Sequence, residues 1–442
     1  MNLTLSPGSP LRGSVSLAGD KSLSHRAALF AALAEGESRI DNFLVSGVTR
    51  AMLGALTALE IKWNLQENCL TVEGKGLYGF STPAAALHCG NSATTLRLLA
   101  GALAASGVNA VLDGSDGLRR RPMGRIVEPL QKMGVPITAA EQGGCPLQLS
   151  ARENGARLKA VDYALPVASA QVKTCLILAA LAADAPVTLS EPVLSRDHSE
   201  RMLRSMGVHI QSWMQPDGRA SLKLTPPDKP LTPLRLSLPA DPSAAAFLIV
   251  AALITPGSEL FLPGVLLNPT RTGLIEALKR MGGIIEVSNR REQNDEPLGD
   301  LTIRAGQLNG TAVSGSQVVD MIDEFPAFAI AAAFARGRTV VSQAEELRYK
   351  ESDRIGLLVQ ALKEMGVSAS DTADGFIIDG SGAVRGGCTL PSHGDHRLGM
   401  SFALAGLAAD APVCVLGAEI INESFPNFAE TLRRLGAGVS LE

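Results

Sequence analysis

The chain repeats one pattern six times. An Ala- and Leu-rich segment of helical length, a Gly or Asp, and a strand-like segment recur along the 442 residues. The residues that end the helical segments lie 71 to 80 positions apart: Gly36, Gly107, Asp184, Gly257, Gly337 and Asp410. A fixed period of this length is typical of repeated structural units. The sequence therefore predicts six small α/β units that share two cores, three units to each core.

A second segment follows the first one in each copy. It is an amphipathic helix that ends in Leu-x-x-[Met/Leu]-Gly, with residues 56–63 as a weaker first copy. Its glycines suit the position after a helix, where φ is positive: Gly134, Gly207, Gly282, Gly366 and Gly436. The first helix of each copy is apolar on all sides and is expected to be buried, while the second has a polar face and is expected outside. Because the two segments alternate in step, chance similarity among Ala-rich helices explains them poorly.

A Pro-rich stretch separates the third copy from the fourth. Residues 225–240 read T-P-P-D-K-P-L-T-P-L-R-L-S-L-P-A. This composition is typical of a domain boundary, so we expect one boundary near residue 239. The strand before Gly19 has no obvious partner nearby, and we expect it to cross into the second domain.

Composition excludes several classes of protein. Hydrophobic residues make up 46% and charged residues 19%, which is typical of a folded chain with large cores. The net charge is −4, so neither a nucleic acid nor a membrane surface is expected as a partner. The longest apolar run, residues 244–254, is much shorter than the roughly 20 residues that a membrane span needs.

Three further absences point to the compartment and to the type of chemistry. The six cysteines form no C-x-x-C pair, and no H-E-x-x-H motif occurs, so we expect reduced thiols and no metal site. The first residues lack the pattern of a signal peptide, which favours a cytoplasmic protein.

The expected inner helices begin with polar residues. Their first turns read G-D-K-S-L-S-H-R (19–26), G-N-S-A-T-T-L-R (90–97), S-A-Q-V-K (169–173), D-P-S (241–243), D-E-F-P (323–326) and D-H-R (395–397). Helix N-termini carry unpaired N–H groups and a partial positive charge, so they bind anions. Several of them aimed at one cleft would hold phosphates and carboxylates without a metal. For Asp241 and Ser243 an ordinary N-cap is the preferred interpretation.

Three basic residues in these turns call for a negatively charged or polar partner. Lys21 and Arg26 lie in the first turn of a helix, at the wrong end of its dipole, and a bound anion beside Ser22 would compensate them. Arg97 interrupts an apolar helix and needs a partner if it is buried.

Basic residues also gather in two other segments. Four arginines follow the turn G-S-D-G: Arg119, Arg120, Arg121 and Arg125. The segment R-Y-K-E-S-D-R (348–354) packs three cations and two acids together. With Asp323, Asp395 and Arg397 these residues predict a cation-rich cleft that also holds a few acids. Such a cleft suits two anionic substrates with acid and base catalysis.

Seven motifs occur in one order along the chain: G-D-K-S-x-S-x-R, G-N-x-x-T-x-x-R, R-P (121–122), S-A-Q-x-K, D-E-F-P, K-E-S-D-R (350–354) and D-H-R. Together they resemble the 5-enolpyruvylshikimate-3-phosphate synthase (3-phosphoshikimate 1-carboxyvinyltransferase) family over essentially the whole chain. The resemblance implies an α/β fold with two domains, each of three βαβαββ repeats around buried parallel helices, an inside-out α/β barrel. Residues 20–238 would form one domain, residues 1–19 and 239–442 the other, with the active site in the cleft between them.

The resemblance also implies a reaction. Members transfer the enolpyruvyl group of phosphoenolpyruvate to the 5-hydroxyl of shikimate 3-phosphate and release phosphate, without a cofactor. Asp323 is implied as the base, and Glu351 as the acid that protonates the enol methylene, with Lys21 assisting. A monomer is the family precedent.

Each substrate has an implied set of ligands. For shikimate 3-phosphate the set is Lys21, Ser22, Arg26, Ser169, Ala170, Gln171, Arg196, Asp323 and Lys350. For phosphoenolpyruvate the set is Lys21, Asn91, Ala93, Arg121, Gln171, Arg354 and Arg397.

Four positions depart from the commonest family pattern. Ala93 stands where most members have glycine, and its methyl group would crowd the inhibitor glyphosate more than the substrate. Leu98 replaces a proline and Ala170 a serine, both typical of the glyphosate-tolerant class, so glyphosate is expected to inhibit weakly. Glu423 stands where sensitive members often have lysine, so no binding role is expected there.

Three rival functions fit the sequence less well. A UDP-N-acetylglucosamine enolpyruvyl transferase would carry Lys-Asn in place of Lys21-Ser22, and a cysteine in the loop 114–125, which has none. An RNA 3′-phosphate cyclase would need a nucleotide site and a basic surface. A catalytically inactive scaffold would have lost Asp323, Glu351 or the arginines, and all are present.

Overall fold

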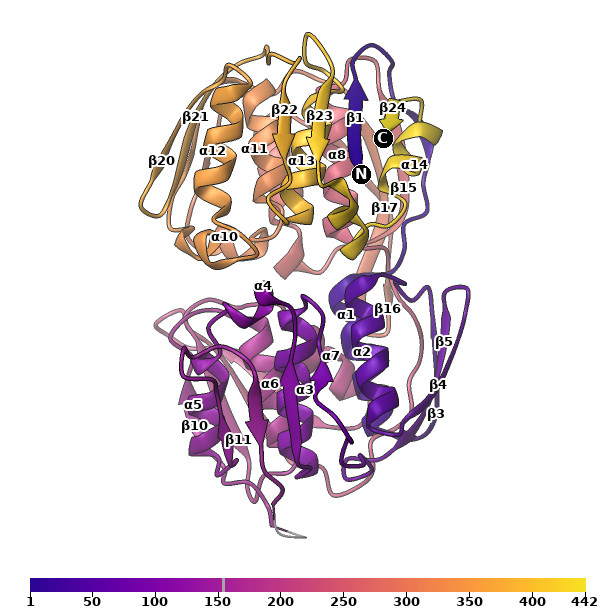
Figure 1. The fold of residues 1–442 in the computed structure, drawn as a ribbon, viewed down its shortest axis with the longest axis vertical. Helices are drawn as coiled ribbons and strands as arrows, with labels where there is room; N and C mark the ends of the chain where they lie inside the picture. The colour runs from indigo at the N-terminus through magenta and orange to yellow at the C-terminus, as the bar shows by residue number, and fades with distance from the viewer. Residues whose placement is uncertain (153–155) are drawn as a thin grey trace. The chain divides into compact units, whose positions relative to one another are not determined.

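The computed structural model describes residues 1–152 and 156–442 (Figure 1). By their internal contacts these residues divide into two compact units. Unit 1 consists of Met1–Ala18, Pro239–Glu292 and Pro297–Glu442, and unit 2 of Gly19–Leu238 and Gln293–Glu296. Each unit contains three four-stranded sheets around three inner helices.

The strands of unit 2 form three sheets. In strand order, the first is β14 (Arg235–Ser237), β3 (Glu35–Asp41), β5 (Cys69–Lys75) and β4 (Lys62–Gln66). The second is β6 (Leu87–His88), β7 (Ala110–Asp113), β9 (Leu147–Leu149) and β8 (Ile137–Thr138). The third is β10 (Asp162–Ala164), β11 (Val187–Glu191), β13 (Ala220–Thr225) and β12 (His209–Met214).

The strands of unit 1 form three sheets of the same design. The first is β16 (Ile284–Gln293), β17 (Glu296–Arg304), β15 (Glu259–Leu266) and β2 (Arg12–Ser14). The second is β18 (Ala312–Val313), β19 (Arg336–Val341), β21 (Gly375–Ser381) and β20 (Ser368–Thr372). The third is β22 (Thr389–Pro391), β23 (Val413–Leu416), β1 (Asn2–Ser6) and β24 (Gly438–Leu441).

The same pairing pattern occurs in all six sheets. In each one a parallel pair is joined to a strand that runs antiparallel to it, as in β6, β7 and β9. The parallel pairs are β14–β3, β6–β7, β10–β11, β2–β15, β18–β19 and β22–β23. The predicted six-fold α/β repeat is therefore confirmed.

Two copies exchange their first strands. β2 precedes the first inner helix but pairs with β15 of the fourth copy, with Arg12 opposite Glu259. β14 precedes the fourth inner helix but pairs with β3 of the first copy. In addition β1 lies between β23 and β24, antiparallel to both, and completes the sheet of the sixth copy.

Helices of two kinds accompany the sheets. The inner helices of unit 2 are α1 (Lys21–Leu33), α3 (Ala93–Ser106) and α6 (Ala170–Ala180), and those of unit 1 are α8 (Pro242–Ile254), α11 (Phe325–Phe334) and α13 (His396–Ala405). The outer helices are α2 (Gly47–Ala58), α5 (Gly124–Lys132), α7 (His198–Ser205), α9 (Gly273–Arg280), α12 (Arg354–Glu364) and α14 (Phe428–Arg434). Short helices complete the chain: α4 (Asp116–Arg119), α10 (Ser316–Asp320), η1 (Pro269–Arg271), η2 (Glu345–Tyr349) and η3 (Ala418–Glu423).

The inner helices are buried along nearly their whole length, as their uniform apolar composition predicts. In α3, a side chain at Gly101 would clash with the carbonyl oxygen of Cys175 in α6, so only glycine allows this approach. The glycines after the outer helices have φ values of 73° to 103°, which confirms their predicted role as helix ends.

Gly36 and Gly337 do not end their helices as expected. α1 ends at Leu33 and α11 at Phe334, so both glycines lie inside the following strands, β3 and β19. Their partners across the sheet are Gly74 and Gly380. A side chain at either partner would clash with the last carbonyl oxygens of the inner helix. The glycines therefore serve the close approach of helix end and sheet.

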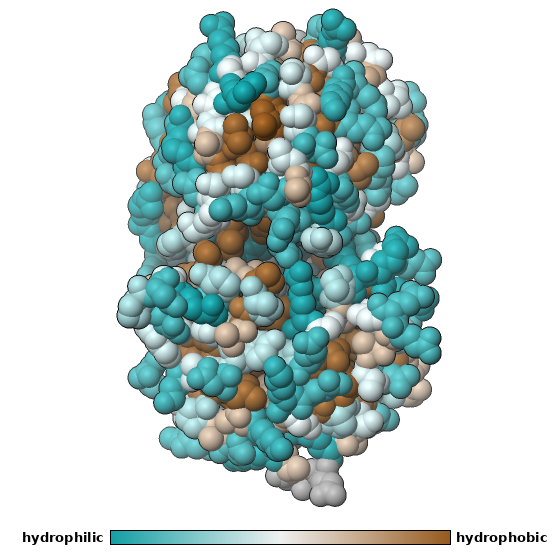
Figure 2. Space-filling model, turned by 90° about the vertical axis from the view of Figure 1, so that its left-hand side faces the viewer, coloured by the Kyte–Doolittle hydropathy of each residue, from teal (hydrophilic) through white to brown (hydrophobic). Residues whose placement is uncertain are grey.

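The surface is mostly hydrophilic on the face that Figure 2 shows, and the brown residues there form separate small patches. Large apolar side chains do reach the surface, among them Trp213 and Met214 of β12. Within the two described ranges, no helix has the length and hydropathy of a membrane span.

Candidate active site

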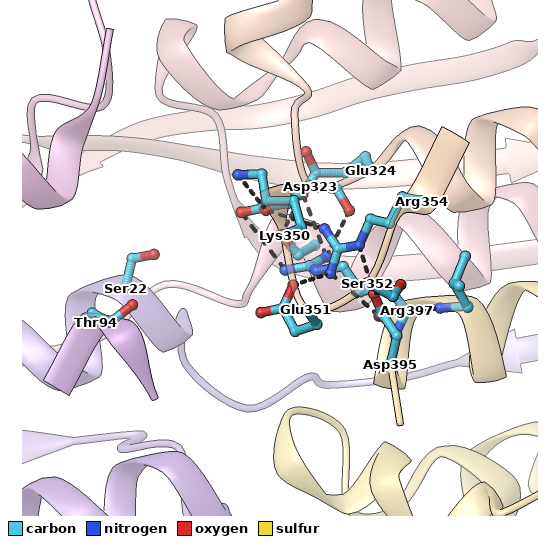
Figure 3. Close-up of polar contacts among 12 residues, drawn as sticks. Ser22, Thr94, Asp323, Glu324, Lys350, Glu351, Ser352, Arg354, Asp395 and Arg397 are labelled. Atoms are coloured by element: carbon cyan, nitrogen blue, oxygen red, sulfur yellow. Dashed lines mark hydrogen bonds and ion pairs between the residues drawn. The ribbon is translucent and has the colours of Figure 1, made fainter. Parts of the chain in front are cut away.

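In unit 1, Asp323 faces three positive charges. It lies two residues before α11, and its Oδ1 atom is 3.7 Å from Lys350 Nζ and 3.7 Å from Arg354 Nη1. Its Oδ2 atom is 3.8 Å from Arg397 Nη2 (Figure 3). Arg397 also donates from Nη1 to the Asp323 carbonyl oxygen at 3.0 Å, which holds the backbone in place.

Arg354 is the buried centre of this cluster. Its Nε donates to Asp395 Oδ2 at 2.8 Å, and its Nη2 donates to Glu351 Oε2 at 2.6 Å. Nη1 is buried without a hydrogen-bond partner, and it is the atom that faces Asp323. Burial alone would lower the pKa of Arg354, but Asp395 and Glu351 raise it above its ordinary value.

Asp395 anchors the same cluster from the protein interior. It is completely buried, accepts from Ser352 Oγ at 3.0 Å, and caps α13 by accepting from the Arg397 backbone N–H at 2.9 Å. Burial alone would raise the pKa of Asp395, but Arg354 lowers it below its usual range. One carboxylate thus fixes two arginines, Arg354 by its side chain and Arg397 by its place on the helix.

The side chains of the cluster differ in how far they are exposed to solvent. The side chains of Asp323 and Glu351 are each 19% exposed and that of Lys350 is 28% exposed, whereas Arg354 and Arg397 are at most 5% exposed. Two carboxylates and one ammonium therefore meet solvent over a layer of buried guanidinium groups. The sequence did not single out Glu324, which lies 3.9 Å from Arg397, or Ser352. Both belong to motifs that the sequence analysis quoted, D-E-F-P and K-E-S-D-R, but the motifs gave neither residue a role.

In unit 2, the N-terminus of α1 carries partly exposed Lys21 and Ser22 over the buried Arg26. Asp20 caps the helix by accepting from the Leu23 N–H at 2.8 Å. Arg26 is 2% exposed, and its guanidinium donates to Ser199 Oγ at 2.7 Å and to Thr174 Oγ1 at 2.8 Å. Arg26 is the sixth residue of α1, so it lies in the second turn and not in the first turn that we expected from the sequence, and hydroxyl groups of the protein serve as its polar partners.

The N-termini of α3 and α6 are joined through Gln171. Its Oε1 accepts from Arg97 Nη1 at 2.7 Å, and its Nε2 donates to Thr94 Oγ1 at 2.9 Å. Arg97 also donates to the Pro122 carbonyl oxygen at 3.0 Å. Gln171 is thus the polar partner that the sequence predicted for Arg97, and Arg121, which precedes Pro122, is partly buried.

Other predicted ligands lie at the same helix ends. Ser169 caps α6, and Arg196 Nη1 lies 3.4 Å from Ser22 Oγ. Ala170 is partly exposed in the first turn of α6. Asn91 accepts from Ser115 Oγ at 2.9 Å, and Ala93 is 2% exposed in the first turn of α3.

His25 is a residue of this region that the sequence left without a role. Its Nδ1 lies 2.8 Å from the Lys21 carbonyl oxygen and its Nε2 lies 3.4 Å from Ser92 Oγ, the cap of α3. Burial lowers the pKa of His25 to about 4, so the ring is neutral near pH 7 and can donate to one neighbour and accept from the other.

The structure thus brings the predicted residues together in two sets, one in each unit. The set of unit 1 is Asp323, Lys350, Glu351, Arg354 and Arg397. The set of unit 2 lies at the N-termini of α1, α3 and α6 and in the loop before α7. Among the described residues, no group of three or more His, Cys, Asp or Glu side chains could hold a metal ion.

This fold is that of the enolpyruvyl transferases. The enolpyruvyl transferase NikO from Streptomyces tendae superposes on 99% of the chain with a TM-score of 0.79, at 20% sequence identity. A solved EPSP synthase from Acinetobacter baumannii covers the whole chain with a TM-score of 0.86 at 39% identity, and the whole of its own chain is matched.

Sequence comparison identifies the family. The family described as EPSP synthase (3-phosphoshikimate 1-carboxyvinyltransferase) matches residues 5–432. The 3-phosphoshikimate 1-carboxyvinyltransferase of Roseiflexus sp. (strain RS-1) is 45% identical over 98% of this chain and 99% of its own length. That of Coxiella burnetii (strain RSA 493 / Nine Mile phase I) is 44% identical over 98% of this chain and 97% of its own. The chain belongs to the EPSP synthase family.

Proposed function

We infer that the chain catalyses the reaction after which its family is named. It transfers the enolpyruvyl group of phosphoenolpyruvate to the 5-hydroxyl of shikimate 3-phosphate and releases phosphate, a step of the shikimate pathway to the aromatic amino acids. The observation that carries this function within the molecule is the position of Asp323. An accessible carboxylate lies among Lys350, Arg354 and Arg397, with a second accessible carboxylate, Glu351, bonded to the same arginine.

The two carboxylates divide the proton transfers between them. Asp323 accepts the proton of the 5-hydroxyl while the hydroxyl oxygen bonds to C2 of phosphoenolpyruvate, and Glu351, assisted by Lys21, delivers a proton to C3. The tetrahedral intermediate carries a phosphate and a carboxylate, which cations stabilise. The C2–O bond to phosphate then breaks, C3 loses a proton, and the vinyl ether and phosphate are released.

Binding of the two anions is assigned to the helix ends and to the cations. Shikimate 3-phosphate is held by Lys21, Ser22, Arg26, Ser169, Ala170, Gln171, Arg196, Asp323 and Lys350. Phosphoenolpyruvate is held by Lys21, Asn91, Ala93, Arg121, Gln171, Arg354 and Arg397. The N-termini of α1, α3 and α6 support this assignment, since their N–H groups and dipoles favour phosphate. For Arg354, the contact runs through Nη1, the atom without a hydrogen-bond partner.

The enzyme acts as a cytoplasmic monomer without a cofactor in this proposal. Its net charge of −4 supports the absence of nucleic-acid partners. Light scattering coupled to size-exclusion chromatography measures the molar mass directly, and a mass twice that of the chain would refute the monomer.

The function is tested by measuring phosphate release from phosphoenolpyruvate with two acceptors. We expect release with shikimate 3-phosphate, and no release above background with UDP-N-acetylglucosamine. Omitting the acceptor controls for plain hydrolysis of phosphoenolpyruvate. Release only with the nucleotide sugar, or with neither acceptor, would contradict the proposed substrate.

We also propose that glyphosate inhibits this enzyme weakly, and the position of Ala93 supports this proposal. Ala93 is 2% exposed in the first turn of α3, and in this proposal its methyl group crowds a ligand larger than phosphoenolpyruvate. Replacing Ala93 with glycine is expected to lower the inhibition constant of glyphosate by roughly tenfold or more, since one steric contact of about 1.4 kcal/mol corresponds to that factor. The KM for phosphoenolpyruvate is expected to change much less.

Steady-state inhibition at several glyphosate concentrations measures this effect. The matched control is Ala104→Gly, the same change near the other end of α3, which should leave the inhibition constant unaltered. An inhibition constant that Ala93→Gly leaves unchanged would remove Ala93 as the cause of tolerance.

A further inference from the structure

Helix α6 carries a buried lysine that none of the roles above requires. Lys173 lies two residues after Gln171 and is 2% exposed among apolar neighbours. Its Nζ atom lies 2.7 Å from Glu191 Oε1 and 2.9 Å from Glu200 Oε1, and both glutamates are 2% exposed. Glu191 ends β11 and Glu200 lies in the first turn of α7, so the cluster spans the loop between them.

The cluster holds one residue of that loop, Ser195, by three groups. Glu191 Oε1 accepts from the Ser195 backbone N–H at 2.9 Å, and Glu191 Oε2 accepts from its hydroxyl at 2.6 Å. Lys173 Nζ donates to the Ser195 carbonyl oxygen at 3.1 Å. The backbone donor, the backbone acceptor and the side chain of Ser195 are therefore all bonded to two charged residues.

Stability alone explains this arrangement poorly. One ammonium and two carboxylates leave a net negative charge in the interior, and Glu200 Oε2 is buried without a hydrogen-bond partner. A buried ion pair is often no more stabilising than well-packed apolar side chains, because desolvation opposes the attraction. Burial alone would lower the pKa of Lys173, yet the two glutamates raise it above its ordinary value, so the lysine remains charged. What the cluster does provide is a fixed geometry.

Fixing Ser195 also restricts the position of the next residue, Arg196. Arg196 is partly buried, and its Nη1 lies 3.4 Å from Ser22 Oγ at the N-terminus of α1. A second buried set joins the same elements, because Arg26 bonds both Thr174 of α6 and Ser199 of α7. The loop before α7 is thus fixed on both sides of Arg196.

We propose that Glu191 and Lys173 are positioning residues that hold Ser195 and thereby aim Arg196 at the phosphate of shikimate 3-phosphate beside Ser22. The inference rests on the proposed function, which places Ser22 and Arg196 among the ligands of that substrate. Glu200 acts in this scheme as a counter-charge to Lys173.

The test compares two variants with the same change of charge. Glu191→Gln replaces one carboxylate oxygen by an N–H group, so it loses a bond to Ser195 or to Lys173, and we expect the KM for shikimate 3-phosphate to rise about tenfold. Glu200→Gln removes an equally buried charge from the same ammonium and leaves Ser195 untouched, so its KM should stay within about twofold. The KM for phosphoenolpyruvate should stay within about twofold in both.

A double-mutant cycle with Arg196→Ala separates positioning from general damage. If Glu191 acts through Arg196, Glu191→Gln should raise the KM for shikimate 3-phosphate by less than about twofold in the Arg196→Ala background. A full tenfold effect in that background, or equal effects of the two glutamine variants, would overturn the inference. So would an unaltered KM in Arg196→Ala alone.

Two further measurements allow the positioning role to be judged even if one variant does not fold or the substrate is not the proposed one. If Glu191→Gln does not fold, as judged by circular dichroism, Ser195→Ala removes only the hydroxyl contact. That variant should raise the same KM by a smaller factor, and an unchanged KM would count against the inference. Wild-type protein runs in every assay, so inactivity of the wild type with shikimate 3-phosphate would refute the proposed function and not the positioning role alone.

Discussion

Replacing Asp323 with alanine is expected to lower kcat by about 10²- to 10⁴-fold, the range typical of a lost general base. The substitution removes the group that accepts the hydroxyl proton and leaves Lys350, Arg354 and Arg397 without their shared counter-charge. Asp323→Asn, which keeps the volume but cannot take up the proton, should lose nearly as much activity. Phosphate release at saturating substrates measures the effect.

The matched control for this prediction is Asp320→Asn. Asp320 ends α10, three residues before Asp323, and has no place in the cluster; burial raises its pKa to about 6. We expect its kcat to stay within about threefold of wild type, since it touches no reacting group. Residual activity of Asp323→Ala above a tenth of wild type would show that another group, or water, acts as the base.

The second large effect concerns stability. Replacing Arg354 with methionine should lower the free energy of unfolding by about 3–5 kcal/mol, because removing one partner of a buried ion pair leaves the other charge uncompensated. Asp395 is completely buried and Glu351 would lose its bond of 2.6 Å. Adding Asp395→Asn should recover much of the loss, since the remaining group is then neutral.

Urea denaturation of the single and double variants measures this difference. Arg348→Met is the matched control: Arg348 also bridges two carboxylates, of Asp353 and Asp371, but at 24% exposure, and such pairs contribute only about 0–1 kcal/mol. Equal losses in Arg348→Met and Arg354→Met would contradict the argument from burial.

The loss of stability caused by Arg354→Met is expected to become smaller as the pH falls. The pKa of Asp395 is lowered in the folded state, so its contribution to stability is present above its ordinary pKa and is lost as pH falls through the folded value. The difference in stability between wild type and Arg354→Met should therefore narrow as the solution is made more acidic. A difference that stays constant down to about pH 3, below the ordinary pKa of an aspartate, would show that Asp395 is not its source.

Much of the fold could be predicted because local sequence patterns specify it. Apolar composition on every side marks α8 and α11 as inner helices, and a glycine after each outer helix marks its end. The exchange of β2 and β14 could not be predicted in this way. Each of these strands has only three residues, and their partners lie more than 190 positions away in the sequence, so no periodicity specifies the pairing.

The same distinction holds for the site. A lysine in the first turn of α1 and an arginine within α3 are conspicuous because they conflict with their local surroundings, and Arg97 does have the polar partner that its position demands. The bond between Arg354 and Asp395 joins residues 41 positions apart, and the bond from Lys173 to Ser195 joins residues 22 positions apart, so no local pattern specifies either contact. A sequence motif indicates that such residues are candidates for a functional role. It does not show which neighbour each residue hydrogen-bonds.

The position of β1 has a consequence for the order of events during synthesis. Apart from Gln293–Glu296, unit 2 comes from the stretch Gly19–Leu238, whereas β1 pairs with β23 and β24, which are synthesised about 400 residues after it. At 5–20 residues per second, a ribosome needs roughly 10–40 s for the 200 or so residues between the end of this stretch and β24. During this time Asn2–Ser6 is a strand without neighbours, open to chaperones and to pairing with other nascent chains. β1 is therefore synthesised before unit 2 but can be paired only after unit 2 has been made.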